Sequence, residues 1–396
     1  MKYKQKKELF KQLESIEDFR IHVGKIVYPL AEVLFMTLFG LLKGKTTFEE
    51  LHDWMEFNRT NTLFLKLFQK EEIGVPSEST LHRILINVDN DKLETVFRGY
   101  FKAFTSSKQI AVDGKWLNGS DANGQYTQQK HKSILNFLDK EKKIVIGHRF
   151  IGDDKKSEIP SFQEELEKNE LFCDEGQVFS FDALMTQSEI LNKINSGKNF
   201  YIAKLKGNQK NLKSKAIETA AAFSSSTSFN EETGYKTEGN NQVARRVDVY
   251  QSPSCDRVMY DSNFDNIQSI IKVTKTTTNL TTGEVKQTTQ WLIANFKQDA
   301  KAFSKMILQH WRVETYHYHL DMLTKEDDHI AYINPFSISI LRSFSINLYQ
   351  LFFNQYKAQK IKVNEVQTKK PLTMARVKRY CENSDQFMLD IFESSE

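Results

Sequence analysis

Apolar residues recur at the spacing of an α-helix throughout the first hundred residues of the chain. Together with turn and capping residues, this pattern predicts helices at 6–16, 29–43, 47–56, 60–69, 78–87 and 90–104. From about 109 to 222, short apolar runs alternate with helical segments, which predicts an α/β sheet with some parallel strands. We therefore expect an all-helical N-terminal part followed by a mixed α/β part.

The pattern changes again between 224 and 300. Runs rich in Val, Thr and Tyr predict strands at 243–250, 269–278 and 285–296. A turn is predicted at Thr282-Gly283, between the last two runs. We interpret this stretch as a β-rich insertion in the α/β part. Beyond Asp299 the spacing is helical again, at 300–323 and 336–357.

The helical stretch around 309–328 carries two different faces. One face, expected to lie against a core, consists of Leu308, Trp311, Thr315, Tyr318 and Met322. The other is a polar stripe that consists of His310, Glu314, His317 and Asp321. A polar stripe on an aromatic helix is either a solvated face or part of a site, and the residues elsewhere in the chain must decide between them.

Two short apolar runs each end on a single aspartate, Asp113 and Asp182. Adjacent parallel strands end on the same edge of a sheet, so two strand-terminal acids can converge there. Magnesium prefers carboxylate oxygens, and a pair of such ions can drive phosphodiester chemistry. Asp113, Asp182 and Glu314 are therefore candidate ligands of such a pair. A lone Asp at a strand end is more often a helix cap or turn former.

The charge of the chain is mild overall and concentrated at its ends. The net charge is +4 at a pI of about 8.6, which alone does not identify a nucleic-acid partner. Residues 2–11 and 357–379 are both rich in basic side chains. Such clusters suit phosphate contacts, and each alone is equally well explained as a solvated basic end.

Cysteine usage and hydropathy point to a cytoplasmic protein. The three cysteines, Cys173, Cys255 and Cys381, are widely spaced and odd in number, which indicates no disulfide framework or zinc knuckle. The most apolar run, 26–42, contains Glu32 and Pro29 and is short for a membrane span. We expect a buried helix there, no membrane partner and a bacterial, nucleoid-associated location.

Six ordered motifs resemble the insertion-sequence transposases of the DDE type, in the branch of the ISAs-type and H repeat-associated proteins. They are AVDGK at 111–115, SEIP at 157–160, FDALMTQ at 181–187, LKGNQ at 205–209, HWRVE at 310–314 and LRSFSINL at 341–348. Two N-terminal segments, 13–34 and 76–85, match the same branch. The resemblance covers most of 9–357 in the family's order.

This resemblance implies an RNase H-like catalytic domain with a β-strand insertion, preceded by a helical, DNA-associated domain. It implies that Asp113, Asp182 and Glu314 are both catalytic residues and ligands of Mg²⁺, for which Mn²⁺ can substitute. It also implies cleavage and strand transfer at element ends by a homodimer on double-stranded DNA. The expected parts are 1–105 (helical), 106–223 (first part of the core), 224–300 (insertion), 301–357 (helical end of the core) and 358–396 (basic tail).

Several polar residues near these motifs are candidate DNA contacts. Lys115 and Lys206 follow the strand ends, where a cation can hold a phosphate. Arg83 projects from a short helix that opens at Ser77 and resembles the start of a helix-turn-helix, although a structural bundle explains it as well. The remaining candidates are Asn208 and Gln209, which can alternatively cap a helix, and Arg312, which can alternatively form an ion pair.

Two other functions stay open at this point. Thr315 stands where the family often has Asn, and 240–246 departs from the family pattern, so a domesticated DNA-binding protein without catalysis is one alternative. Glu314 and His317 form an ExxH pair, as in carboxylate-histidine metalloenzymes. That design needs a second such pair on a facing helix, and the sequence contains none.

Overall fold

The first part of the chain is helical, as its apolar spacing predicts. In residues 4–20 and 26–105 of the computed structural model, the helices are α1 (Lys4–Glu14), α2 (Leu30–Leu42), α3 (Phe48–Phe57), α4 (Thr62–Phe68), α5 (Glu78–Asn87) and α6 (Asn90–Lys102). Helix α2 is apolar on all sides and buried along its whole length. Gly40 lets α3 approach it closely, because a Cβ there would lie 2.5 Å from Leu51 Cδ2.

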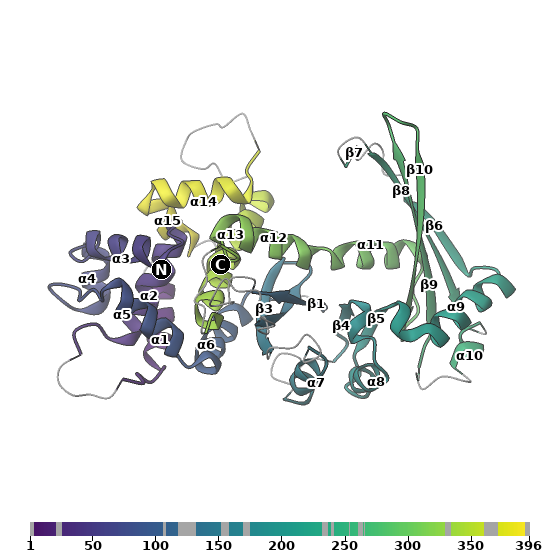
Figure 1. The fold of residues 1–396 in the computed structure, drawn as a ribbon, viewed down its shortest axis with the longest axis horizontal. Helices are drawn as coiled ribbons and strands as arrows, with labels where there is room; N and C mark the ends of the chain where they lie inside the picture. Colours follow the sequence, from purple (N-terminus) through teal and green to yellow (C-terminus); the bar gives the residue numbers. More distant parts are fainter. Residues whose placement is uncertain are drawn as a thin grey trace, which may run out of the picture. The chain divides into compact units, whose positions relative to one another are not determined.

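The structure describes 4–20, 26–105, 108–117, 132–151, 158–168, 175–231, 237–238, 241–252, 254–259, 264, 266–328, 334–359 and 371–392. These residues belong to two compact units, drawn in Figure 1. The helical unit consists of Met1–Ser107, Gly114–Ser157 and Glu314–Glu396, and the sheet unit of Lys108–Asp113 and Glu158–Val313. Cys173, Lys2 and residues 360–370 of the basic stretch 357–379 lie outside the described residues.

In the helical unit, a long helix organises the core. This helix, α13 (Phe336–Gln359), contacts α2, α6, α14 (Met374–Asn383), α15 (Asp385–Ile391) and the hairpin strand β3 (Ile144–Ile151). Strand β3 pairs antiparallel with β2 (Ser133–Asp139). The Asn347 side chain accepts from Val145 N–H at 3.0 Å and donates to Val145 O at 2.7 Å, so it joins α13 to the hairpin.

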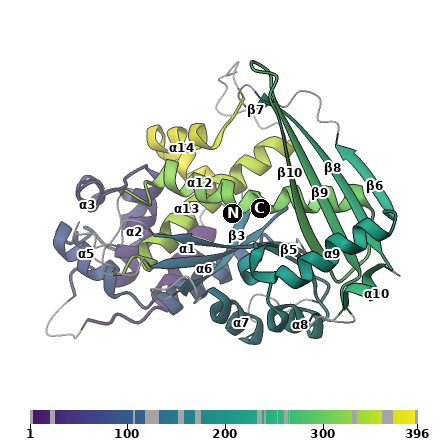
Figure 2. The ribbon, with the colours of Figure 1, turned by 45° about the vertical axis from the view of Figure 1, so that its right-hand side comes forward.

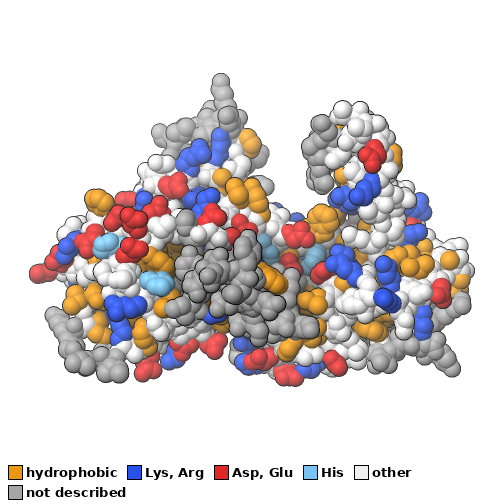
Figure 3. Space-filling model, in the orientation of Figure 1, with side chains coloured by type: hydrophobic (Ala, Val, Ile, Leu, Met, Phe, Trp, Pro, Cys, Tyr) orange, Lys and Arg blue, Asp and Glu red, His pale blue; other side chains and the backbone are white. Residues whose placement is uncertain are grey.

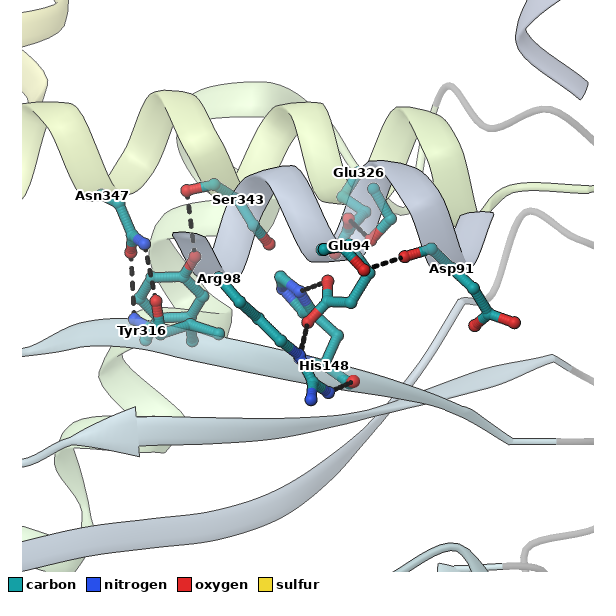
Figure 4. A network of polar contacts seen from close by, with 11 residues as sticks. Asp91, Glu94, Arg98, His148, Tyr316, Glu326, Ser343 and Asn347 are labelled. Atoms are coloured by element: carbon teal, nitrogen blue, oxygen red, sulfur yellow. Dashed lines mark hydrogen bonds and ion pairs between the residues drawn. The ribbon is translucent and has the colours of Figure 1, made fainter. Parts of the chain in front are cut away.

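A buried ionic network joins α6 to β3 within this unit, as Figure 4 shows. Glu94 accepts from Arg98 Nε at 2.7 Å, from His148 N–H at 2.6 Å and lies 2.8 Å from His148 Nδ1. Arg98 in turn donates to His148 O at 2.6 Å. Burial raises the pKa of the Glu94 carboxyl, but His148 and Arg98 outweigh it, and the pKa lies below its usual value.

The sheet unit is built on parallel strands that continue into an antiparallel ladder. Strand β4 (Val178–Phe181) pairs in parallel with β1 (Gln109–Trp116) and with β5 (Phe200–Leu205). Next to β5 follow β10 (Val285–Ala294), β9 (Ser269–Asn279), β8 (Asn241–Gln251) and β6 (Thr227–Glu231). Because β10 pairs antiparallel with β5, the strands predicted at 243–296 extend this sheet, and Figure 2 shows them side by side.

Helices complete the sheet unit: α7 (Glu158–Lys168), α8 (Ser188–Ser196), α9 (Lys210–Ala222), α10 (Ser254–Met259) and α11 (Ala300–His310). Asp299 caps α11 by accepting from Ala302 N–H at 2.7 Å. Phe303 and Ala300 of α11 pack against Val247, Ile271 and Leu292 of the ladder. This packing fixes where α11 ends.

The predicted core face of the 309–328 stretch is wrong. A turn at Trp311 separates α11 from α12 (Arg312–Thr324), and Trp311, Tyr318 and Met322 are exposed. The buried side chains are instead Val313, Tyr316, Leu320 and Leu323. Both faces of this stretch are rich in apolar and aromatic residues. The prediction assumes one continuous helix, and the turn at Trp311 rotates the residues after it, so periodicity alone selects the exposed face as the buried one.

The chain is thus a mixed α/β protein, as predicted, and most of its strands pair antiparallel. Its RNase H-like character stays a prediction. Among the described residues, no helix combines the length and the apolar composition that a membrane crossing requires.

Candidate active site

Asp113 and Asp182 occupy matching positions on neighbouring strands of the sheet, where Asp182 directly follows β4, whereas β1 continues beyond Asp113 to Trp116. Val112 of β1 lies opposite Phe181 of β4 in the parallel register, and the two aspartates are the next residues. Both preceding side chains are buried, while both aspartates are half-buried. Residues in register on parallel strands face the same side of the sheet. The register therefore places the backbones of these two predicted acids at neighbouring positions.

The Asp182 carboxylate is charged and lies beside two lysines. Lys206 Nζ is 2.8 Å from Oδ2, and Lys204 Nζ is 3.4 Å from Oδ1. Burial raises the pKa of Asp182, but the Lys206 hydrogen bond and the charges of both lysines outweigh it, so that pKa lies below its usual value. Oδ1 is buried and accepts no hydrogen bond. A hard cation would find an ionised oxygen there.

The LKGNQ motif holds the loop that carries Asp182. Asn208 Nδ2 donates to Ala183 O at 2.7 Å, and Gln209 Nε2 donates to the carbonyl oxygens of Ala183 and Thr186. Thr186 Oγ1 donates to Lys204 O at 2.9 Å, which closes the loop onto β5. Neither predicted use, a DNA contact or a helix cap, explains these bonds. Gln209 is at the N-cap of α9, but its side chain makes no capping bond.

Glu314, the third predicted acid, begins the portion of α12 that belongs to the helical unit. Its side chain is exposed. Along the chain it follows His310 by four residues, and in the sheet unit His310 Nδ1 lies 3.0 Å from Ser180 Oγ on β4. Nowhere in the described part of the chain do three His, Cys, Asp or Glu side chains already form a group that would hold a metal.

Lys115 has other partners than the predicted DNA phosphate. Its side chain is only 6% exposed, and its ammonium lies 2.7 Å from Asp321, 3.0 Å from Asp327 and 3.4 Å from Glu326 in the helical unit. Burial lowers the pKa of Lys115, but the three acids outweigh it and raise that pKa. An ammonium that is already shared by three carboxylates is a poor ligand for a phosphate. The ion pairs of Lys115 therefore indicate a structural role, and its contact with DNA stays a prediction.

His317, the partner of Glu314 in the ExxH pair, also has a structural neighbour. Asn136 Nδ2 lies 3.0 Å from His317 Nε2. Burial, and to a lesser extent the charge of Lys115, lowers the pKa of His317 to about 3, so the ring is neutral. This contact accounts for His317 without a metal.

The other predicted DNA contacts remain at the surface. Lys206 is 53% exposed beyond its ion pair with Asp182, and Arg312 is partly exposed in the first turn of α12. Arg83 is exposed on α5, where its guanidinium donates to Thr80 Oγ1 at 3.0 Å. The start of α5 borders a groove of about 660 Å³, lined among others by Thr47, Ser77 and His82. The helix-turn-helix reading of this region stays a prediction.

Comparison with known proteins identifies relatives along most of the chain. The family described as DDE_Tnp_1-associated matches residues 10–101. The putative protein YbfL of Escherichia coli (strain K12) is 26% identical over 81% of this chain and 84% of its own. The H repeat-associated putative transposase YhhI of the same strain is 25% identical over the same shares, 81% and 84%.

A solved structure of the piggyBac transposase, a synaptic complex with hairpin DNA, aligns with 97% of this chain and 80% of its own. The TM-score is 0.48 and the identity 11%, too low to support an argument. The relatives in sequence are the informative ones. They confirm the resemblance that the six motifs predict, to insertion-sequence DDE transposases of the H repeat-associated branch.

Proposed function

We propose that this chain, a relative of the H repeat-associated proteins, is a transposase that cuts the ends of its own insertion sequence. It would then join the freed 3′ hydroxyl to target DNA. One observation supports the proposal: Asp113 and Asp182 directly follow Val112 and Phe181, which are paired on neighbouring parallel strands, and both stand in the order and motifs of the DDE family. Glu314 in HWRVE supplies the third acid.

The donor set fits magnesium, and Mn²⁺ can replace it. Asp113, Asp182 and Glu314 offer only carboxylate oxygens, and Asp182 Oδ1 is buried without a hydrogen bond. When bound, Mg²⁺ would lower the pKa of the attacking hydroxyl and stabilise charge on the leaving oxygen. The chain itself holds Asp182 ionised and fixes its loop through Asn208 and Gln209. Lys206 is exposed enough to hold the DNA phosphate.

The parallel strands β1, β4 and β5 with acids at neighbouring positions support an RNase H-like catalytic core, interrupted by the β-rich insertion. We assign the parts as the sequence suggests, with 1–105 as the helical DNA-associated region, 106–223 and 301–357 as the core, 224–300 as the insertion and 358–396 as the basic tail. Arg83 and Arg312 belong to the proposed DNA contacts. Action at paired ends implies a homodimer on DNA.

A cleavage and strand-transfer assay tests this function. The purified protein is incubated with the DNA that flanks its own gene, in Mg²⁺, in Mn²⁺ and in EDTA, beside Glu314→Gln. We expect discrete cuts and joined products in either metal, and none in EDTA or with the variant. Tight binding to those ends without cutting in either metal would instead identify a DNA-binding protein derived from a transposase.

Loosening the Asp182 loop should slow cleavage. Gln209→Leu removes both hydrogen bonds to the loop while keeping the volume of the buried side chain. We expect a fall in cleavage rate of about 10- to 100-fold, the usual cost of losing a residue that orients a metal ligand. The Mg²⁺ concentration for half-maximal rate should rise, which a purely structural role would not cause. Gln163→Leu, on the surface of α7, is the control; an unchanged Mg²⁺ dependence in Gln209→Leu would contradict the role.

A further inference from the structure

Trp311 is a large aromatic residue held at the surface of the sheet unit. It follows the last residue of α11, and its side chain is 41% exposed. Its position is fixed, because α11 packs on the ladder through Phe303 and the preceding His310 contacts Ser180. An indole that is anchored at its backbone and open to solvent has one face or edge available to a ligand.

Two cations lie over this indole. Arg245 on β8 and Lys275 on β9 are directly opposite each other in the antiparallel register. The Arg245 guanidinium carbon and the Lys275 ammonium nitrogen are each 5.9 Å from the centre of the Trp311 ring. At this distance the ring attracts the cations and keeps them beside it. The unit therefore presents an aromatic surface and two positive charges at one place.

Lys272 and Trp291 form a similar cation–aromatic pair on the opposite face of the ladder, but the indole of this pair is buried. Lys272 lies 5.8 Å from the centre of the Trp291 ring, with which it is directly paired in the β9–β10 register. Trp291 is only 6% exposed, so that indole serves the core. Burial thus explains Trp291 and does not explain Trp311.

The surroundings of Trp311 combine basic and polar side chains with the apolar residues Val247, Val273, Ile307 and Leu308. Residues two apart on a strand share a face, so Lys286 and Gln290 of β10 lie on the same face as Lys275. Gln290 lines a small hollow together with Arg245, Lys275 and Trp311. Figure 3 shows Lys and Arg side chains on the outer part of this unit. A negatively charged ligand with a flat apolar part matches this surface in charge and in shape.

We propose that Trp311, Arg245 and Lys275 bind an unpaired nucleotide of a DNA strand, with its base stacked on the indole and its phosphates on the two cations. Aromatic rings beside basic side chains are the usual means of holding single-stranded DNA, because every base has a face that stacks. In a fully paired duplex the bases are already stacked on each other, so Trp311 discriminates in favour of an open strand. This inference rests on the proposed function and adds a strand-binding surface to it.

Binding of two labelled DNAs by the full-length protein in EDTA tests the proposal. One is a fluorescein-labelled duplex, and the other is the same duplex with a short single-stranded thymidine overhang, both followed by fluorescence anisotropy. We expect Trp311→Leu to weaken overhang binding about tenfold, the loss of one stacked base, and to leave the duplex unchanged. Trp311→Phe, which retains a ring, should lose less.

The two cations are tested by salt dependence. Arg245→Gln and Lys275→Gln should each reduce the slope of log affinity against log salt for the overhang DNA by about 0.7, as one phosphate contact is lost. Lys272→Gln, beside buried Trp291, is the matched control and should leave the slope unchanged. An equal effect of Lys272→Gln, an equal loss on both DNAs, or no loss in Trp311→Leu would overturn the proposal.

Two further outcomes separate this proposal from its premise. A wild-type protein that cuts its own ends but binds overhang DNA no better than Trp311→Leu would overturn the strand surface alone. A wild-type protein that neither binds nor cuts DNA would overturn the transposase function with it. A change in oligomeric state in Trp311→Leu without a change in DNA affinity would make this surface a contact between copies of the chain, which also overturns the proposal.

Discussion

Asp182→Asn should reduce DNA cleavage at least about a thousandfold and leave binding of the element ends intact. An amide of the same shape keeps the loop that Asn208 and Gln209 hold, but it removes the ionised oxygens that a hard cation requires. Metal-assisted activation is worth several kcal/mol, and about 4 kcal/mol corresponds to a thousandfold in rate. Single-turnover cleavage and anisotropy with the same labelled ends measure both quantities.

The affinity of Asp182→Asn for the element ends should not fall below that of the wild type. Lys206 is shared between Asp182 and solvent, at 2.8 Å from the carboxylate. Neutralising Asp182 removes a negative charge next to the DNA phosphate and releases Lys206, so affinity should stay equal or increase. Asp113→Asn should show the same loss of cleavage, since it removes the acid at the neighbouring position.

A matched control lies at the other ends of the same strands. Glu175 precedes β4 and Lys198 precedes β5, and their ion pair is 2.6 Å long and exposed. Glu175→Gln removes an equivalent lysine–carboxylate pair without touching the site, so cleavage should not change. Substantial cutting by Asp182→Asn, or a comparable loss in Glu175→Gln, would exclude Asp182 from the chemistry.

The strands that carry the two aspartates were predictable because their signal is local. A short apolar run that stops at an acid predicts a buried strand, and Val112 and Phe181 are both buried in strands. The strand ends at the acid only for Phe181-Asp182, since β1 continues past Asp113 to Trp116. The strands of the 243–296 stretch were likewise recognised from β-branched residues. Their pairing with β5 was not, because register depends on residues far apart in the sequence.

Side-chain partners were the part that the sequence did not specify. Lys115 follows Asp113 by two residues, yet its ammonium meets acids from the end of α12 and the turn after it. Asn208 and Gln209 reach back to the loop after β4 through bonds that no spacing rule predicts. Such contacts depend on how separate segments pack, and one sequence carries no record of that packing.

Glu94→Gln should destabilise the helical unit by about 3 kcal/mol at neutral pH. Glu94 is buried and satisfies Arg98 and His148 at once, so neutralising it leaves buried donors and a buried cation without their counter-charge. Removing one partner of a buried ion pair typically costs about 3–5 kcal/mol. The amide introduced by Glu94→Gln keeps some of the hydrogen bonds, so we expect a net cost at the lower end of this range, about 3 kcal/mol. Urea unfolding followed by circular dichroism measures the loss.

The difference between wild type and Glu94→Gln should depend on pH with a defined sign. Because His148 and Arg98 hold the pKa of folded Glu94 below its usual value, this carboxylate contributes its full stability above the unfolded pKa of about 4.3. That contribution is lost as the pH falls through the lower, folded pKa. The gap in unfolding free energy should therefore narrow below about pH 4.

An exposed pair in the same unit provides the comparison. Glu56 on α3 and Arg59, two residues beyond the end of that helix, form an ion pair of 3.3 Å in which both side chains are exposed. Glu56→Gln should change the unfolding free energy by less than about 0.5 kcal/mol, because water screens such pairs and already hydrates both charges. If Glu94→Gln were as mild as Glu56→Gln, or if its cost grew as the pH fell, the ionised carboxylate would not be what joins α6 to β3. The narrowing below about pH 4 matters equally, because a cost that came only from poorer packing would persist unchanged into acid.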